Sequence, residues 1–119
     1  MDKIRLYHNP RCSTSRKVLE MIRDAGHEPE IIDYLKTPPT AEELLALAAA
    51  SGESIRTLLR TKQAEYLEQG LDNPALSEAQ IAAAIATTPV LLNRPVVHSA
   101  RGARACRPVE TVYELLPEH

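Results

Sequence analysis

The first 34 residues alternate between strand-like and helix-like patterns, and this alternation constrains the fold more than any other feature. Residues 4–7 and 30–34 are short, largely apolar runs of strand character. Between them the sequence predicts a helix that ends at Gly26, with an apolar face formed by Val18, Leu19, Ile22 and Ala25. We expect its N-terminal cap to be Ser13, Thr14 or Ser15. A strand, a helix and a second strand in this order predict two parallel neighbouring strands.

The middle of the chain, residues 40–87, is predicted to be an all-helical insert. Two capping boxes, Thr-Ala-Glu-Glu at 40–43 and Ser-Glu-Ala-Gln at 77–80, each predict the start of a helix. Ser54 is expected to cap a shorter helix between them. Because these signals are local, they indicate where helices begin but not how the helices pack.

The last part of the chain returns to strand-like sequence. Residues 90–94 and 96–98 have strand character, Gly102 marks a turn, and residues 103–106 are expected to form a partner strand. Pro108 fits the first position of a final helix. Together with the N-terminal unit, this pattern predicts an α/β sandwich with a four-stranded mixed sheet.

Length and composition favour one globular domain covering residues 1–119. The apolar fraction of 44% allows a core without disulfides or a structural metal. A net charge of −2 and 3% aromatic residues argue against nucleic-acid binding. The sequence shows neither an apolar signal region nor an 18-residue apolar run, so we expect a soluble cytoplasmic protein that does not bind a membrane. In that compartment the two cysteines favour catalysis or redox chemistry over a structural bridge.

The distribution of arginine indicates a binding site for an anion. Ten of the fourteen basic residues are Arg, and residues 94–107 contain four of them without any Asp or Glu. Guanidinium groups bind planar or tetrahedral oxyanions through paired N–H donors. The alternative is an exposed strand edge that carries charge only to prevent aggregation.

Cys12 lies in the segment HNPRCSTSRKV, residues 8–18, at the predicted start of the first helix. Unpaired N–H groups and the positive end of the helix dipole favour a thiolate at such a position. Arg11, Arg16, Lys17 and a protonated His8 would act in the same direction. An unperturbed cysteine, with a pKa of about 8.5, is only a few per cent thiolate at neutral pH. We interpret Cys12 as a nucleophile in an anion-binding loop, the alternative being an ordinary small residue between a strand and a helix.

The spacing around Cys12 argues against several familiar motifs. A Cys-x-x-Cys redox pair would need a cysteine where the chain has Ser15, so a redox cycle would require an external thiol. A phosphatase-type Cys-x5-Arg loop would need an arginine in place of Val18. His8 and Cys12 are four residues apart, but Pro10 disfavours a helix across them, and we expect no metal site.

The motif around Cys12 and later blocks of sequence resemble one family. HNPRCSTSR, EIIDYLKTPPT, IRTLLR, VLLNRP and ACRP occur in this order and resemble the glutaredoxin-linked bacterial arsenate reductases over residues 4–117. The resemblance implies a thioredoxin-like fold in which the cysteine that attacks arsenate is Cys12. It also assigns the substrate-binding and supporting residues: Arg60, Arg94 and Arg107 as anion-binding arginines, His8 as the group that depresses the thiol pKa, Ser15 as a small polar residue of the anion loop, and Pro95 as a cis-proline.

The same resemblance implies the reductants. Glutathione would be a co-substrate and glutaredoxin a protein partner, with no bound cofactor. Two other readings stay open: a related transcription regulator that binds RNA polymerase, and a reductase-like protein acting on another oxyanion or on a glutathione adduct. Cys106 is either a resolving thiol for Cys12 or a small residue of the strand; we favour the strand residue because free cysteines are commonly buried.

Overall fold

The computed structural model describes residues 3–117; residues 1–2 and 118–119 of the expected domain lie outside the described part. The strands are β1 (Arg5–His8), β2 (Glu30–Asp33), β3 (Val96–Ser99) and β4 (Gly102–Ala105). The α-helices are α1 (Ser13–Asp24), α2 (Ala41–Ser51), α3 (Ala64–Glu68) and α4 (Glu78–Thr87). Short 3₁₀ helices are η1 (Ile55–Leu58), η2 (Pro89–Leu91) and η3 (Val109–Glu114).

The four strands form one mixed sheet in the order β2-β1-β3-β4. β1 and β2 are parallel neighbours, with Leu6 opposite Ile31, which confirms the strand–helix–strand prediction. β3 runs antiparallel to both β1 and β4. The expected α/β architecture with a four-stranded mixed sheet is therefore present.

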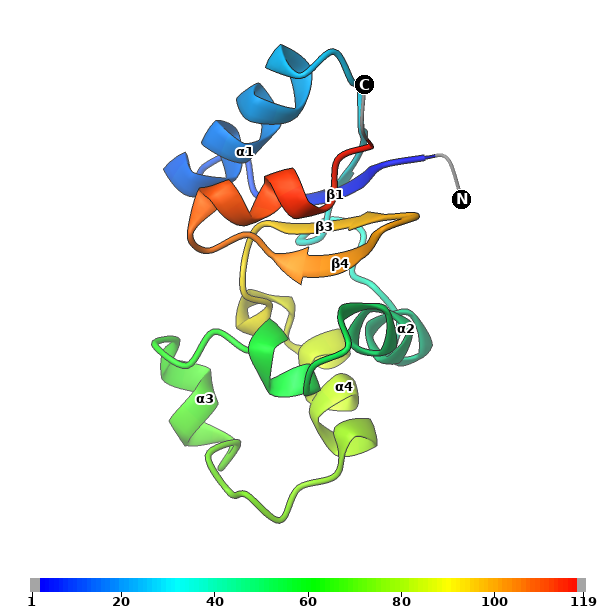
Figure 1. Cartoon of the computed structure of the whole chain (residues 1–119). Coiled ribbons are helices and arrows are strands. Elements are labelled where there is room, and N and C mark those ends of the chain that lie inside the picture. The colour runs from blue at the N-terminus through cyan, green and yellow to red at the C-terminus, as the bar shows by residue number, and fades with distance from the viewer. Residues whose placement is uncertain (1–2, 118–119) are drawn as a thin grey trace.

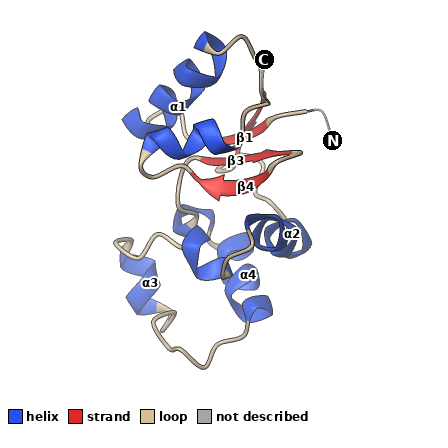
Figure 2. Ribbon diagram, viewed as in Figure 1, coloured by secondary structure: helices blue, strands red, loops and turns tan. Residues whose placement is uncertain are grey.

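The sheet separates two layers of helices (Figures 1 and 2). Helices α1 and η3 cover one face, and the insert from α2 to η2 lies against the other. The central strand β1 serves both layers because successive side chains point to opposite faces. Leu6 is buried in the cluster beneath α1, whereas Tyr7 is buried in the cluster shared with the insert.

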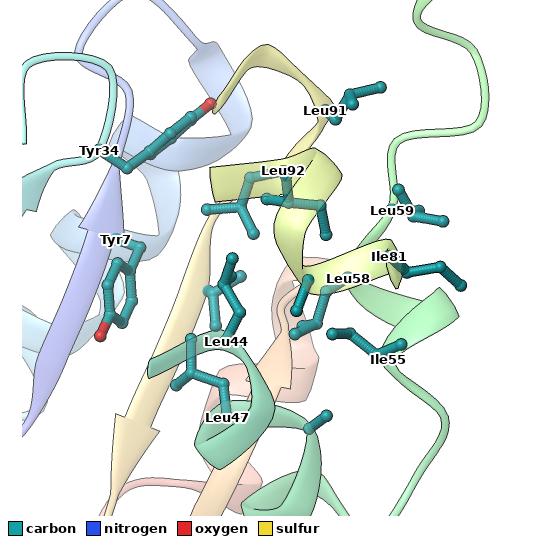
Figure 3. Close-up of a cluster of buried hydrophobic side chains, with 14 of the residues drawn as sticks. Tyr7, Tyr34, Leu44, Leu47, Ile55, Leu58, Leu59, Ile81, Leu91 and Leu92 are labelled. Carbon is teal, nitrogen blue, oxygen red and sulfur yellow. The ribbon is translucent and has the colours of Figure 1, made fainter. Parts of the chain in front are cut away.

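The insert folds because each of its main helices has a local start signal and a buried apolar face. Thr40 and Ser77 form complete capping boxes with Glu43 and Gln80, as predicted. Figure 3 shows the cluster in which the insert packs against the sheet, including Leu44, Leu47, Leu58, Ile81 and Leu92. Each buried leucine or isoleucine contributes about 1.5–3 kcal/mol. This packing holds the end of η1, and with it Arg60, beside the sheet.

The strand-like prediction for residues 90–94 is wrong. Residues 89–91 form η2, and the strand begins only at Val96. The apolar run arises because Leu91 and Leu92 are fully buried in the insert's cluster, which demands hydrophobic residues without demanding a strand. The one β-type contact here is an isolated bridge between Leu92 and Leu59 within the described residues.

Smaller details also differ from expectation. The last strand, β4, begins at Gly102, which was expected in the turn, and ends at Ala105. The last helix is 3₁₀ rather than α, and Pro108 precedes it as the capping residue. The short helix α3 was not anticipated, because none of its residues is buried and it therefore leaves no apolar pattern. The first strand begins and ends one residue later than expected, at Arg5 and His8. Among residues 3–117, no helix combines the length and apolar character needed to cross a bilayer.

Candidate active site

Cys12 is the N-terminal capping residue of α1 and sits where the chain turns out of β1. The expectation that Ser13, Thr14 or Ser15 would cap the helix is wrong, because Cys12 holds the N-cap position, and no described side chain forms a capping hydrogen bond there. The Cys12 backbone closes the turn: its N–H donates to the Asn9 carbonyl at 3.0 Å, and its carbonyl accepts from the Arg16 N–H at 3.0 Å. The half-buried sulfur therefore faces the unpaired N–H groups of the first helical turn.

The environment of the sulfur favours the thiolate. Burial on its own would raise the pKa of Cys12, but the Ser15 amide, the charge of Arg94 and the Thr14 amide together hold that pKa below its ordinary value. Arg94 also hydrogen bonds to the sulfur. The Nη2 of Arg107 lies 3.7 Å from the Cys12 Sγ. The thiolate expected from the sequence has a physical basis here.

Backbone contacts bring Arg60, Arg94 and Arg107 together from separate parts of the chain. The Arg60 N–H donates to the Leu91 carbonyl at 2.7 Å, which ties the end of η1 to the segment before Arg94. The Cys106 N–H donates to the Pro95 carbonyl at 2.8 Å, which places Arg107 beside Arg94. The Arg94–Pro95 bond is cis, as the resemblance implied, and so is the Arg107–Pro108 bond.

The three guanidinium groups repel one another in the absence of an anion. Burial lowers the pKa of Arg60, and the charges of Arg94 and Arg107 lower it further. Within residues 3–117, the buried Nε of Arg94 has no hydrogen-bond partner. An oxyanion would reduce the repulsion among the three cations and would give the buried donor an acceptor. This arrangement is therefore suited to bind an oxyanion.

His8 and Ser15 form a buried pair behind the thiol rather than on the surface of the site. The His8 Nδ1 lies 2.6 Å from the Ser15 Oγ, and the two side chains belong to residues that are 6% and 0% exposed. Burial lowers the pKa of His8, although the charge of Asp33 opposes this effect, so burial favours the neutral imidazole. A charged His8 beside the thiolate, as the sequence suggested, does not match this burial. Ser15 faces the sulfur through its amide, while its hydroxyl bonds to His8 and to the Asn9 N–H.

Asn9 holds the loop together and was not assigned a role from the sequence. Its carbonyl accepts from Cys12 N–H, its N–H donates to Ser15 Oγ at 3.0 Å, and its side-chain oxygen accepts from Arg11 N–H at 3.0 Å. With the oxygen so engaged, the side-chain amide donates to the hydroxyl of Tyr34. All four polar groups of Asn9 are thus used to shape the turn that carries Cys12.

Tyr34 is a further residue of the site that sequence reasoning missed. It is 1% exposed, and Figure 3 shows its hydroxyl directed toward the segment that leads into β3. Burial raises the pKa of Tyr34, while Arg94 and the Asn9 amide oppose that rise, so its hydroxyl stays protonated near the sulfur. A sequence signal existed: Tyr34 directly follows β2, and parallel strands β1 and β2 end at the same edge of the sheet.

A cleft of about 370 Å³ opens beside the arginines. Its walls are Leu59, Arg60, Thr61, Lys62, Asn93 and Arg107. Within the described residues, no group of three or more His, Cys, Asp or Glu side chains is placed to hold a metal ion. The arrangement combines a nucleophilic sulfur, three nearby guanidinium groups and a cleft lined by two of them, Arg60 and Arg107.

Cys106 lies on the other side of the sheet from the insert. It is 0% exposed and packs in the cluster beneath α1, and burial raises its pKa to about 12. Its Sγ lies 3.7 Å from the Arg104 carbonyl. These contacts favour the reading of Cys106 as a buried strand-end residue over a resolving thiol.

Comparison with known proteins identifies close relatives. The chain is 48% identical over 118 residues to the protein named arsenate reductase from Yersinia enterocolitica, covering 99% of this chain and 84% of that protein. It is also 48% identical over 118 residues to arsenate reductase from Escherichia coli strain K12, again covering 99% of this chain and 84% of that protein. The solved arsenate reductase from Vibrio cholerae superposes with a TM-score of 0.91 at 39% identity, covering 97% of this chain and 98% of that one. The ArsC family model matches residues 7–115. These matches confirm the resemblance drawn from the sequence: the chain belongs to the ArsC family.

Proposed function

We propose that this chain reduces arsenate to arsenite, with Cys12 as the nucleophile and glutathione and glutaredoxin as the sources of electrons. The observation that carries the proposal is that the Cys12 sulfur lies 3.7 Å from Arg107 Nη2 and also interacts with the charges of Arg94 and Arg60. The relatives described above are named arsenate reductases, which supports the same activity.

Substrate binding is assigned to the three arginines. Arsenate is a tetrahedral oxyanion, and paired guanidinium N–H groups match its oxygens. Binding relieves the mutual repulsion that lowers the pKa of Arg60 and supplies an acceptor for the unpartnered Nε of Arg94. Neutralising the negative charge of arsenate also permits a second anion, the Cys12 thiolate, to approach it.

In the first chemical step, the Cys12 thiolate attacks arsenic(V) and an As–O bond breaks, so that a hydroxyl leaves as water after taking up a proton. The product is an adduct with a bond between sulfur and arsenic(V). The amides of Ser15 and Thr14, together with Arg94, keep the sulfur ionised for this attack. His8 acts indirectly, because its bond to the Ser15 hydroxyl fixes the turn that presents these amides.

In the second stage, glutathione supplies the other thiol. The two sulfurs together give up two electrons and form a Cys12–glutathione disulfide, while arsenic(V) leaves as arsenite, arsenic(III). Glutaredoxin then reduces this mixed disulfide and restores the Cys12 thiol. A buried Cys106 with a pKa of about 12 is poorly suited to resolve the disulfide, which supports an external route.

The same thiol chemistry leads us to place the protein in the cytoplasm. A reducing glutathione pool is needed to regenerate Cys12 after each turnover, and that pool is a property of the cytoplasm. The reaction proposed here needs thiols and guanidinium groups, with no bound cofactor.

A coupled assay tests the proposal. Purified protein is mixed with glutathione, glutaredoxin, glutathione reductase and NADPH, and we expect arsenate to start NADPH oxidation. Cys12→Ser should abolish the arsenate-dependent NADPH oxidation because an alcohol does not ionise at neutral pH. Cys106→Ala should retain this activity. Failure of arsenate to support turnover, combined with tight binding to RNA polymerase, would instead favour the transcription-regulator reading. Turnover with another oxyanion but not arsenate would favour the third reading.

A further inference from the structure

The cleft beside Arg60 is larger than arsenate requires. Its volume is about 370 Å³, whereas arsenate is only a few times larger than a water molecule, which takes up roughly 30 Å³. The volume falls within the range of roughly 300–1,000 Å³ in which small-molecule sites usually lie. Arg107 lines the cleft, and its Nη2 lies 3.7 Å from the Cys12 Sγ, so one side chain links the cleft to the reacting atom.

The charge of this cleft distinguishes it from its neighbour. Of the described residues that line it, Arg60, Lys62 and Arg107 are cationic and none is acidic. An adjoining cleft of about 400 Å³ shares Asn93 and Arg107 but also contains Glu53 and Glu114. In that second cleft Glu53 already forms an ion pair with Arg104. A ligand with net negative charge is therefore favoured in the cleft of Lys62 and not in the other.

Glutathione has the matching chemistry. It carries more carboxylates than amines, so it is a net anion at neutral pH, and its central thiol must reach arsenic bound to Cys12. Arg60 and Arg107 are assigned to the oxyanion, and the Asn93 side-chain amide donates to the Thr57 carbonyl, which leaves Lys62 and the hydroxyl of Thr61 as polar groups of the lining. Both are exposed and can meet an incoming carboxylate.

We propose that the cleft lined by Arg60, Thr61, Lys62 and Asn93 is the glutathione site, with Lys62 binding a carboxylate of the tripeptide. This inference rests on the function proposed above, because it locates the second substrate of the same reaction. The proposal assigns Lys62 to glutathione and not to arsenate. A substitution at Lys62 should therefore affect glutathione binding, whereas substitutions at the three arginines should affect arsenate binding.

Steady-state kinetics with varied glutathione test the assignment. We expect Lys62→Gln to raise the KM for glutathione about two- to fivefold, the effect of losing one partly exposed charge pair, and to leave the KM for arsenate unchanged. Lys62→Glu should raise the KM for glutathione further, and Lys62→Arg should give the wild-type KM for glutathione. The matched control is Lys36→Gln, which removes an exposed lysine from a different cleft, formed with Asn9, Pro10 and Arg11. An unchanged glutathione KM in Lys62→Gln, or an equal rise in Lys36→Gln, overturns the proposal.

A binding measurement separates this proposal from the activity itself. S-methylglutathione, which has no free thiol, is titrated into the wild-type protein while backbone amide NMR signals are followed. We expect shifts at Thr61, Lys62 and Asn93 that weaken in Lys62→Gln. Such shifts without arsenate turnover would refute the proposed function but retain the site, whereas turnover without them would refute the site alone.

Discussion

The Nε–H of Arg107 donates to the carbonyl oxygen of Arg94 across 2.7 Å. The bond fixes the plane of the Arg107 guanidinium, so that its Nη2 faces the Cys12 sulfur. One anion-binding residue is thus oriented by the backbone of another. A long side chain that would otherwise sample many rotamers is held ready for substrate, which reduces the entropy lost on binding.

Arg107→Lys tests this orientation. Lysine keeps the positive charge but lacks a fork that can bond to Arg94 and face the sulfur at the same time. We therefore expect the KM for arsenate to rise about tenfold or more, a loss of at least roughly 1.4 kcal/mol, in the coupled assay. Arg23→Lys is the matched control, since Arg23 is exposed on α1 and pairs with Glu28. Equal KM values for Arg107→Lys and the wild type would contradict the role of the fork.

The ionisation of Cys12 gives a second prediction, read from the rate of alkylation as a function of pH. Its pKa is held below the ordinary value, so the thiolate fraction and the rate of alkylation fall only when the pH drops through that lowered pKa. Arg94→Gln removes a positive charge and should shift the midpoint upward, with slower alkylation at pH 7. Cys106 is an internal control: it should stay unmodified in the folded protein because it is buried and its pKa is about 12. An ordinary midpoint for Cys12 in the wild type would refute the proposed nucleophile.

Tyr34→Phe tests the support behind the loop. The variant keeps the buried ring but loses the hydroxyl that accepts from the Asn9 amide, so the turn around Cys12 should loosen. We expect a kcat about three- to tenfold lower, consistent with loss of one hydrogen bond, and a higher Cys12 pKa. Tyr7→Phe is the control, because Tyr7 is also buried in this cluster but its hydroxyl points to the opposite end of it (Figure 3). Equal effects of the two substitutions would indicate general destabilisation instead.

The expectation of a single domain is tested by unfolding. Leu58→Ala creates a cavity where the insert packs on the sheet, and it should lower the free energy of unfolding by about 2–5 kcal/mol. Leu67→Ala, at a side chain that is 68% exposed, should change it by less than about 0.5 kcal/mol. Urea unfolding followed by circular dichroism and by tyrosine fluorescence should give one coincident transition in each variant. Separate transitions for the two probes would show that the insert unfolds independently.

The local elements were predictable because their signals lie within a few residues of each other. The capping boxes at Thr40 and Ser77 form as expected, and the parallel pairing of β1 with β2 follows from the strand–helix–strand order. The apolar run at 90–94 led to the wrong prediction of a strand, because burial in the insert's cluster favours leucine just as a strand does. Helix α3 left no signal because none of its residues is fully buried.

The sequence by itself determined which kinds of group the site contains: a thiol at a helix start, three arginines in recognisable blocks, and the family to which they belong. Only the tertiary structure decided what those groups do to one another. It buried His8 as a hydrogen-bond partner of Ser15, oriented Arg107 through the carbonyl of Arg94, and brought Tyr34 and Asn9 together behind the nucleophile. Hydrogen bonds and pKa values depend on distance and burial, and contacts between residues far apart in the chain set both.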